Sequence, residues 1–506
     1  MSNYDVVVIG SGNAGLTAAV TAQRMGKKTL LVEKHNIPGG CATSFVRGDF
    51  EFEVALHQLS GLGTEDKPFI MRQIFNELGV MDKVQFVQEK ELYRLVIPNE
   101  LDITLPASWS GIRKVLHEQF PQEISNIDHF MQICEHLTVE SFKTVPHAQR
   151  LQDQAFLEAH CPYFMKYGFR TLSDVVNEIF QDQKLISVVI AYWYYTGAAP
   201  NRMLFSDLAV MLYAYAVFKP WHIKGGSQAM SNALLESFLE AGGEARFNCG
   251  VEKILTQGGK ISAVRLEDGS IHPCHAVISN ASPILTFNEL LDIEAPEKIK
   301  LDFKSRRMGT SAFVIYLGLD RTPEQLGIHV PSMFISRTTD WEKVYDVMET
   351  FHSPISGMLT CYNVDDADAA PTGKSQVVLV CLQYADVWNN VAPEQYAKVK
   401  YEFADQLIDL IESTVCPEIR THIEELEVAT PLTMMRYLNS PGGAIYGFNQ
   451  NATDSALIRD RLNTVEGLYF AGSWTSMGGF QPTYTAGVST ARAVVKTLQK
   501  QELEHV

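Results

Sequence analysis

The apolar positions near the start of the chain predict a strand, a helix and a second strand. A continuous apolar run at 6–9 indicates a strand buried on both faces. Small and apolar residues recur through 16–25, which suits a helix packed on a sheet, and Gly26 ends this segment. Another apolar run at 29–32 predicts the next strand. This order of elements is typical of an α/β fold with a parallel sheet.

Similar patterns recur along the chain without an internal sequence repeat. Strands are predicted at 261–266, 276–281, 311–319 and 376–383, and helices at 393–415 and 486–498. The polar residues 500–506 are expected to form a frayed tail.

The most apolar stretch, 185–218, is rich in tyrosine and tryptophan. Pro200, Asn201, Arg202 and Asp207 interrupt it, so neither part reaches the roughly 20 residues of a membrane span. Three interpretations stay open for this stretch: protein core, the wall of a site for a hydrophobic substrate, or a surface that dips into a bilayer.

Length and charge restrict the class of protein. The 506 residues suggest two to four domains, and 46% hydrophobic residues are enough for large cores. The chain has 42 Lys and Arg against 59 Asp and Glu, a formal net charge of −17. Such a charge repels a phosphate backbone, so no nucleic-acid partner is expected.

The eight cysteines are scattered without paired spacing, which favours reduced thiols and a cytoplasmic protein. The first residues lead directly into the apolar run at 6–9, so we expect no secretory leader. No metal-binding motif is present in the sequence, and no metal is expected.

A glycine-rich motif separates the first strand from the first helix. Gly10, Gly12 and Gly15 form G-x-G-x-x-G, and Glu33 ends the second strand 18 residues later. These glycines allow a tight turn, close approach of backbone N–H groups to a pyrophosphate, and tight helix packing, while the carboxylate can bind a ribose hydroxyl. The sequence therefore predicts an adenine dinucleotide site, which suits either NAD or FAD.

The segments after Glu33 resemble a known family. Lys34 leads through Gly39 and Gly40 to Cys41 and Ala42, and residues 50–57 end in His57. This pattern is similar to the N-terminal segments of the FAD-dependent phytoene desaturase, carotenoid isomerase and retinol saturase family. Two positions depart from that pattern: Cys41 replaces an Arg common in desaturases and amine oxidases, and Glu53-Val54-Ala55 replaces Asp-x-Gly.

Segments near the C-terminus and in the middle of the chain also resemble this family. They are 467–474, 478–483, 220–230, 251–254, 276–281 and 440–447. The resemblance implies FAD as cofactor, with contacts from Gly10, Gly12, Asn13, Ala14, Gly15, Glu33, Lys34, Gly40, Cys41, Ala42, Val251, Asn280, Gly472, Ser473, Gly479, Phe480 and Thr483.

These anchors imply an α/β fold with two interleaved domains. An FAD-binding Rossmann-like domain of the glutathione-reductase type would comprise 1–75, 220–295 and 450–506. An inserted α+β substrate domain would comprise 76–219 and 296–449.

The resemblance also implies the chemistry. A flavin can take a hydride from a C–H bond, return one to a conjugated alkene, or hold electrons while a double bond rotates. We expect an oxidoreductase that acts on C=C or C–C bonds of a hydrophobic polyene or isoprenoid-like substrate. Oxygen, a quinone or a nicotinamide could exchange electrons with it, and peripheral membrane contact is left open.

Candidate catalytic residues are few, and other functions stay open. His57 follows the family hairpin, Tyr484 follows the C-terminal glycines, and Arg202 lies in the aromatic stretch. Glu53 can be structural or chemical, and Arg202 and Asp207 can bind a polar substrate head or form a salt bridge between helices. Cys41 can be a reactive thiol or a small residue that lines the backbone. The alternatives are a flavin amine oxidase-like enzyme, a redox cyclase of a polyene natural product, and a non-catalytic flavin-binding scaffold.

Overall fold

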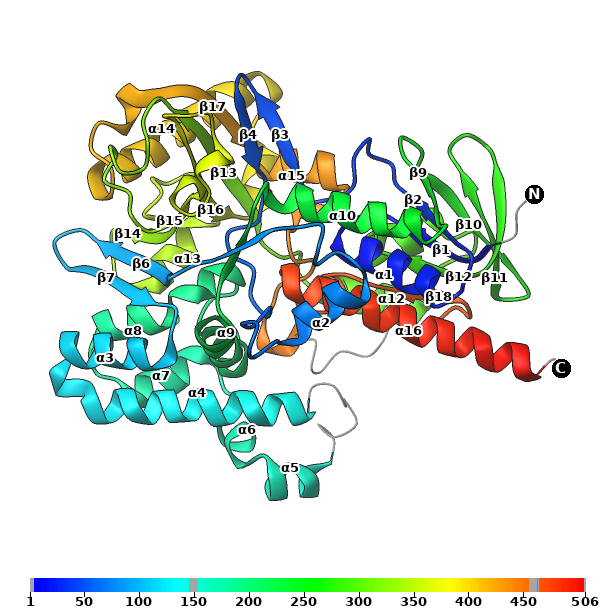
Figure 1. Ribbon diagram of the computed structural model, residues 1–506, viewed down its shortest axis with the longest axis horizontal. Coiled ribbons are helices and arrows are strands. Elements are labelled where there is room, and N and C mark those ends of the chain that lie inside the picture. The colour runs from blue at the N-terminus through cyan, green and yellow to red at the C-terminus, as the bar shows by residue number, and fades with distance from the viewer. Residues whose placement is uncertain (1–3, 145–152, 455–461, 463, 505–506) are drawn as a thin grey trace.

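The chain builds two seven-stranded sheets that lie side by side, with most helices packed on or between them (Figure 1). The computed structural model describes residues 4–144, 153–454, 462 and 464–504.

The first sheet combines strands from both ends and the middle of the chain. Its order is β10-β11-β12-β1-β2-β9, with β18 added along β12. β1 is parallel to its two neighbours, and Val7 lies opposite Leu30 on one side and Val277 on the other. The strands are β1 (Tyr4–Ile9), β2 (Thr29–Val32), β9 (Glu244–Arg246), β10 (Val251–Gln257), β11 (Lys260–Leu266), β12 (Ile271–Ser279) and β18 (Leu468–Phe470).

Three helices cover one face of this sheet: α1 (Asn13–Arg24), α10 (Gly226–Glu240) and α16 (Phe480–Glu504) (Figure 1). α1 and α16 cross so closely that a Cβ on Gly487 would lie 2.1 Å from Thr17 Oγ1 and 2.2 Å from the Ala14 carbonyl oxygen. Thr17 Oγ1 donates a hydrogen bond to the Tyr484 carbonyl oxygen at 3.1 Å. The crossing therefore requires glycine at position 487.

The second sheet is mixed, in the order β17-β13-β16-β15-β14-β6-β7. β13 and β16 are buried along their whole lengths because both faces of the sheet are covered. Alternate residues point to opposite cores: Phe313 and Ile315 face α14, whereas Val314 and Tyr316 face the helical region. The strands are β6 (Glu91–Ile97), β7 (Leu101–Pro106), β13 (Ser311–Leu319), β14 (Ser332–Ser336), β15 (Ser356–Cys361), β16 (Ser375–Gln383) and β17 (Ile423–Ala429).

The helical region beside the second sheet contains the apolar stretch 185–218. Most of its side chains are buried, including Tyr192 and Trp193, so the core interpretation holds for most of this stretch. In the described part of the chain, no helix is long and apolar enough to cross a membrane. The helices are α3 (Trp109–Gln119), α4 (Ile124–Thr144), α5 (Gln154–His160), α6 (Pro162–Tyr167), α7 (Leu172–Ile179), α8 (Gln183–Ile190) and α9 (Phe205–Phe218), with the 3-10 turn η3 (Ala191–Tyr195).

The hairpin β3 (Ser44–Arg47) and β4 (Phe50–Glu53) joins the two halves of the molecule. Although it belongs to the N-terminal stretch, it lies beside β13 and β17 (Figure 1). Phe50 sits against Gly318 of β13, where a Cβ would come within 2.6 Å of its ring. Phe45 meets Tyr316 edge to face at 4.9 Å. The hairpin is thus part of the second sheet's core, although the sequence assigned 1–75 to the FAD-binding domain.

The remaining α-helices and strands connect these parts or, as α14 does, pack on the second sheet. They are α2 (Ile70–Glu77), β5 (Phe86–Gln88), β8 (Trp221–Ile223), α11 (Pro283–Leu285), α12 (Glu297–Ser305), α13 (Trp341–Val347), α14 (Tyr396–Thr414) and α15 (Pro431–Leu438), with the turns η5 (Tyr362–Val364) and η9 (Ile419–His422).

The predicted strands and helices agree with these bounds to within a few residues, except at β12, which begins at Ile271 and ends at Ser279 rather than spanning 276–281, and at the C-terminus. α16 begins at Phe480 rather than 486, since Pro482 lies in the first turn, where proline is tolerated. The helix also continues to Glu504, so the frayed tail predicted from residue 500 is wrong for 500–504. Its end is attached to the domain, because Lys27 Nζ lies 2.5 Å from Glu502 Oε1. Residues 505–506 lie outside the described residues.

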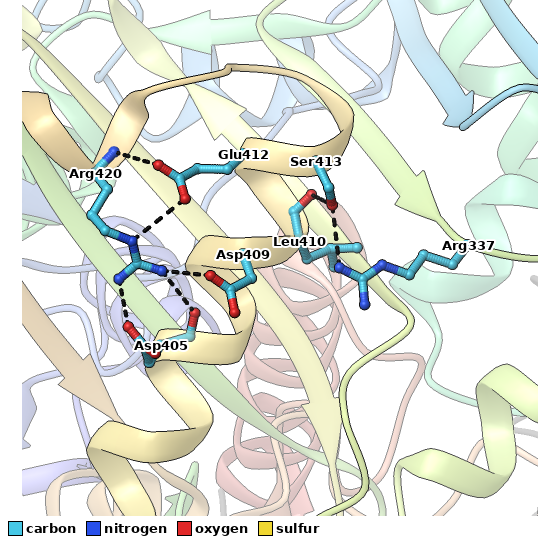
Figure 2. Close-up of polar contacts among 7 residues, drawn as sticks. All are labelled: Arg337, Asp405, Asp409, Leu410, Glu412, Ser413 and Arg420. Carbon is cyan, nitrogen blue, oxygen red and sulfur yellow. Dashed lines mark hydrogen bonds and ion pairs between the residues drawn. The ribbon is translucent and has the colours of Figure 1, made fainter.

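We call the first sheet with its helices the first domain, and the second sheet with the helices packed on it the second domain. An arginine holds η9 on α14 at the surface of the second domain. Figure 2 shows Arg420 among Asp405, Asp409 and Glu412, three acidic residues on one face of α14. Its Nη2 lies 2.6 Å from Asp409 Oδ1, and its Nε lies 3.4 Å from Glu412 Oε2. One guanidinium therefore offsets the mutual repulsion of three carboxylates.

Candidate functional site

Two glycine-rich loops meet above the carboxyl end of β1. The Gly39 N–H donates to the Ser11 carbonyl oxygen at 2.9 Å, and Gly12 pairs with Gly39 as an isolated parallel bridge. A Cβ on Gly15 would lie 1.9 Å from the Gly10 carbonyl oxygen, and one on Gly40 would lie 3.3 Å from Gly12 Cα. These contacts leave no room for side chains, so the loops expose backbone.

Glu33 directly follows β2 and lies beside the first loop. Its Oε2 accepts hydrogen bonds from the Ser11 backbone N–H at 2.6 Å and from Ser11 Oγ at 2.8 Å. Its Oε1 accepts from the His35 N–H at 2.8 Å. These three bonds fix the carboxylate beside the glycine turn, where the sequence predicted contact with a ribose.

Asn280 links this loop to the C-terminal part of the chain. It follows β12 directly, and its Nδ2 donates to the Ala471 carbonyl oxygen at 2.9 Å. A Cβ on Gly12 would lie 2.7 Å from Asn280 Oδ1, and one on Gly472 would lie 2.6 Å from Asn280 Nδ2. The Asn280 side chain therefore lies between two glycines that are separated by most of the sequence.

The second of these glycines begins a loop that ends in α16. Gly472 and Gly479 both have positive φ, at 124° and 103°. Thr483 Oγ1 donates to the Gly479 carbonyl oxygen at 2.7 Å, and the neighbouring Phe480 begins the helix. Ser473, between Gly472 and the loop, is half-buried.

The residues present fit a dinucleotide. No side chain caps the N-terminus of α1, so its first N–H groups are free for a phosphate. Among the described residues, the buried Asn13 Oδ1 has no hydrogen-bond partner. An uncapped helix N-terminus, glycines that Cβ atoms would block and an unpaired amide oxygen together form a cradle for a pyrophosphate.

The remaining predicted cofactor residues differ in burial and in their contacts. Ala14 and Ala42 are buried, and the Ala42 carbonyl oxygen accepts from Ser231 Oγ at 2.7 Å. Val251 begins β10 and is 8% exposed. Lys34 is exposed and lies 3.7 Å from Glu267 Oε1, so it points to the surface.

The junction between the two domains lies beside the C-terminal loop. A Cβ on Gly61 would lie 2.7 Å from the Gln481 side chain, and one on Gly478 would lie 2.4 Å from the Tyr446 ring. The segment that follows the β3–β4 hairpin and the loop that contains Tyr446 thus both pack against 478–481.

Five tyrosines of the second domain hold the segment 54–58. Tyr316 and Tyr362 donate to the carbonyl oxygens of Val54 and Leu56, at 3.3 and 2.8 Å. Three more tyrosine hydroxyls bond to Gln58: Tyr192 and Tyr195 to Oε1, at 3.2 and 3.3 Å, and Tyr215 to the carbonyl oxygen, at 3.2 Å.

The Gln58 amide nitrogen completes this network. It donates to Glu89 Oε2 at 2.5 Å and to the Leu92 carbonyl oxygen at 2.8 Å. Glu89 is 1% exposed, and burial raises the pKa of its carboxyl well above the usual range. The buried amide therefore has a partner for every polar atom.

His57 lies in the middle of this segment and is half-buried. Its Nδ1 is 2.6 Å from Thr360 Oγ1, and its ring is parallel to that of Tyr195, with centroids 6.3 Å apart. Burial lowers the pKa of the imidazole to about 4. His57 is therefore neutral at physiological pH and is not an imidazolium acid.

The comparisons with known proteins identify the family. The model of the family described as flavin containing amine oxidoreductase matches residues 13–495. The chain belongs to this family. FAD is therefore its cofactor, and the chain is an FAD-dependent oxidoreductase, as the sequence predicted.

Relatives of known function are similar over nearly the whole chain. All-trans-retinol 13,14-reductase from Danio rerio is 25% identical over 97% of this chain and 86% of its own. Prolycopene isomerase from Daucus carota is 25% identical over 98% of this chain and 80% of its own. The lycopene-forming phytoene desaturase from Pseudescherichia vulneris is 24% identical over 97% of this chain and 99% of its own. These relatives confirm the resemblance to this branch of flavoenzymes.

Solved structures confirm the fold. An oxidoreductase from Methanosarcina mazei matches with a TM-score of 0.65 and 16% identity, over 98% of this chain and all of that one. Putrescine oxidase with bound putrescine matches with a TM-score of 0.65 and 12% identity, over 98% of this chain and 99% of its own. The α/β flavoenzyme fold predicted from the sequence is therefore correct.

Glu53 has a structural position in this flavoenzyme. Its carboxylate accepts four hydrogen bonds: from Ser227 N and Oγ at 2.6 and 2.7 Å, from Leu56 N at 3.0 Å and from Ala55 N at 3.1 Å. Burial raises the pKa of this carboxyl, and the hydrogen bonds oppose the shift. Glu53 thus joins the FAD-domain helix α10 to the segment that contains His57.

Two candidate catalytic residues lie away from the junction segment. Tyr484 is fully buried in the core of the first domain, and its ring meets Phe75 edge to face at 5.3 Å. Arg202 is exposed, with its guanidinium 5.2 Å from the Tyr345 ring centroid. Burial raises the pKa of the Cys41 thiol to about 11, so Cys41 is a neutral thiol beside Gly40.

Two residues of this candidate site were not predicted from the sequence. Thr360 lies in a buried strand whose pattern gives no hint of a partner for histidine. Gln58 directly follows His57, and the position of these two polar residues between Leu56 and Leu59 was the available signal.

Proposed function

We propose that this FAD-dependent oxidoreductase acts on C=C or C–C bonds of a hydrophobic polyene or isoprenoid-like chain, by desaturation, saturation or isomerisation. The proposal rests on the neutral, aromatic character of the junction beside the C-terminal loop. Its residues are His57, Tyr195, Tyr215 and Tyr446, with Cys41 nearby.

None of these five side chains is charged at neutral pH. Burial raises the pKa values of the three tyrosines, and it raises that of Cys41 to about 11. The His57 imidazole, with a pKa near 4, is neutral as well. An apolar chain can enter such a site without desolvating an ion, whereas an ammonium substrate would lack a free carboxylate among these residues.

The relatives support the same substrate class. The retinol reductase, the prolycopene isomerase and the phytoene desaturase are named for polyenes, and their names cover reduction, isomerisation and desaturation. Putrescine oxidase shares only the fold at 12% identity, so it carries less weight.

We assign roles to the chain's own residues on this basis. The N-terminus of α1 binds the pyrophosphate of FAD, Glu33 binds a ribose, and the loop that begins at Gly472 holds the flavin end. FAD, when bound, supplies two-electron oxidation and reduction. Of the three candidate catalytic residues, His57 contacts the substrate, whereas Tyr484 and Arg202 stabilise the fold.

The test is an anaerobic screen of the FAD-loaded protein against carotenoid precursors, retinoids and polyenoic acyl chains. The flavin absorbance reports reduction or reoxidation, and mass spectrometry reports the product. A loss of two hydrogens indicates desaturation, a gain of two indicates saturation, and an unchanged mass indicates isomerisation or cyclisation. The number of rings in the product distinguishes these last two reactions.

Amines serve as the contrasting substrates. Hydrogen peroxide release with an amine, and no response to any polyene, would refute the proposal in favour of an amine oxidase. A flavin that no substrate of either class reduces or reoxidises would favour a non-catalytic scaffold. Oxygen, a quinone and a nicotinamide are then compared as electron partners by their rates with the enzyme.

A further inference from the structure

The two ring nitrogens of His57 have different surroundings. Nδ1 lies 2.6 Å from Thr360 Oγ1, which is well within hydrogen-bond distance. Nε2 makes no hydrogen bond with any described residue. The residue is half-buried, so part of it is accessible to a molecule that enters the junction, and its ring lies parallel to that of Tyr195.

The surroundings of Thr360 determine which nitrogen holds the proton. Thr360 is 2% exposed, and His57 Nδ1 is the one hydrogen-bond partner of its hydroxyl among the described residues. A buried hydroxyl that donates to nothing costs free energy, so the Thr360 O–H donates to Nδ1. In a neutral imidazole whose Nδ1 accepts, the proton is on Nε2.

We propose that His57 presents a neutral Nε2–H donor to an oxygen atom of the substrate, so that the enzyme prefers polyenes with a hydroxyl or carbonyl group at the end that enters the junction. Thr360 is the positioning residue that selects this tautomer. The inference rests on the proposed function and names the substrate class within it.

The aromatic surroundings give this donor its effect on specificity. Tyr192, Tyr195 and Tyr215 already use their hydroxyls on Gln58, so His57 has the free donor among these four residues. A pure hydrocarbon would cover the Nε2–H and leave it unpaired, whereas an oxygen atom would accept from it. A site with a buried polar donor strongly rejects an analogue that has no acceptor for it. This discrimination is larger than the discrimination by size that an apolar pocket achieves.

Three ligands with the same carbon skeleton test the proposal. All-trans-retinol both donates and accepts, all-trans-retinal only accepts, and the deoxy hydrocarbon does neither. The oxidised FAD-loaded protein is titrated anaerobically with each, and the flavin absorbance reports binding. We expect the alcohol and the aldehyde to bind about tenfold more tightly than the hydrocarbon, which corresponds to about 1.4 kcal/mol.

Matched variants locate the preference. His57→Phe keeps a ring against Tyr195 but removes the donor, so the three ligands should bind equally. His57→Gln retains an N–H donor and should keep part of the preference. Thr360→Val removes the hydroxyl that selects the tautomer and should reduce the preference at least threefold, while Thr360→Ser should restore it. A Thr360 that only packs would lower the affinity for all three ligands alike.

A direct measurement needs no substrate. Nitrogen NMR of protein labelled in histidine, with the His57 signals assigned by their loss in His57→Phe, reports which nitrogen is protonated. Protonated Nε2 and unprotonated Nδ1 are expected. The reverse pattern would overturn the proposal, even if the variants fold poorly.

The outcomes separate this inference from the proposed function. Tight binding of the alcohol alone would mean that Nε2 accepts, and equal binding of all three ligands would mean that it takes no part. Either result overturns the inference while leaving polyene chemistry intact. A protein whose flavin no polyene reduces or reoxidises would instead refute the proposed function.

Discussion

The crossing of α1 and α16 at Gly487 gives the sharpest stability prediction. In Gly487→Ala the new Cβ would lie 2.1 Å from Thr17 Oγ1 and 2.2 Å from the Ala14 carbonyl oxygen. Ordinary contacts need more than 3 Å, so the helices must separate by about 1 Å. The carbonyl belongs to the helix backbone and cannot rotate away, unlike the end of a flexible side chain.

The magnitude follows from two opposed effects. Overpacking of this kind costs about 1–3 kcal/mol, and a backbone obstacle places it near the upper end. Replacing glycine by alanine inside a helix recovers about 1 kcal/mol of helix propensity. We therefore expect a net loss of about 2 kcal/mol and a melting temperature lower by roughly 2–6 °C.

The same displacement should weaken FAD binding. α1 begins with the predicted pyrophosphate site and α16 begins with Phe480 and Thr483, so separating the helices moves two parts of the cofactor site apart. The FAD affinity of the apoprotein, measured by fluorescence titration, should fall about tenfold, or about 1.4 kcal/mol.

A variant on the same helix provides the control. Ser489 lies two residues beyond Gly487 and is exposed, so Ser489→Ala should leave both the melting temperature and the FAD affinity unchanged. If Gly487→Ala also behaves like the wild type in both assays, the close crossing, and the reasoning drawn from it, is wrong.

Three further predictions concern buried and surface charges. Glu53→Gln replaces an acceptor of four hydrogen bonds with an amide that cannot accept them all. Chemical denaturation should therefore show a free energy of unfolding lower by about 2 kcal/mol. Unchanged stability would contradict the role assigned to this carboxylate. Burial raises the pKa of the Asp207 carboxyl to about 7. Between about pH 4 and pH 7 the folded state therefore keeps a proton on this carboxyl that the unfolded chain releases. The free energy of unfolding consequently falls as the pH rises through this range. Asp207→Asn should therefore have a higher melting temperature than the wild type at pH 8 but not at pH 4. A difference in melting temperature that is the same at both pH values would contradict the raised pKa. Arg420→Ala leaves three carboxylates facing one another and should cost up to about 1 kcal/mol at low salt, less at high salt, whereas a loss insensitive to salt would argue against an electrostatic cause.

The glycine turn of the predicted cofactor site could be found from the sequence because its geometry is local. Gly10, Gly12 and Gly15 lie within six residues, and their spacing alone requires a turn at the start of a helix. Glu33 is fixed by its place at the end of the next strand. Such features depend on neighbours in sequence, which a single chain displays directly.

The substrate half was less predictable because its contacts join distant segments. The hydroxyl of Tyr362 bonds to the carbonyl of Leu56, 306 positions away, and Thr360 meets His57 over 303 positions. The pattern of apolar residues places Thr360 in a buried strand, but it does not indicate which residue lies opposite Thr360. The packing of Phe50 on Gly318 was hidden for the same reason, so the hairpin was assigned by its neighbours in sequence.

The interleaved first sheet also has a consequence for how the protein is made. A ribosome delivers β1, β2 and α1 first, then β9 to β12, and only at the end β18 and α16. Asn280 can meet the Ala471 carbonyl, and Thr17 the Tyr484 carbonyl, only after those last residues emerge. The nascent chain must therefore keep an unfinished parallel sheet during most of its synthesis. With the loop at Gly472 holding the flavin, as we propose, FAD capture is a late event in the biogenesis of this enzyme, and a nonsense mutation as late as β18 removes part of the proposed cofactor site.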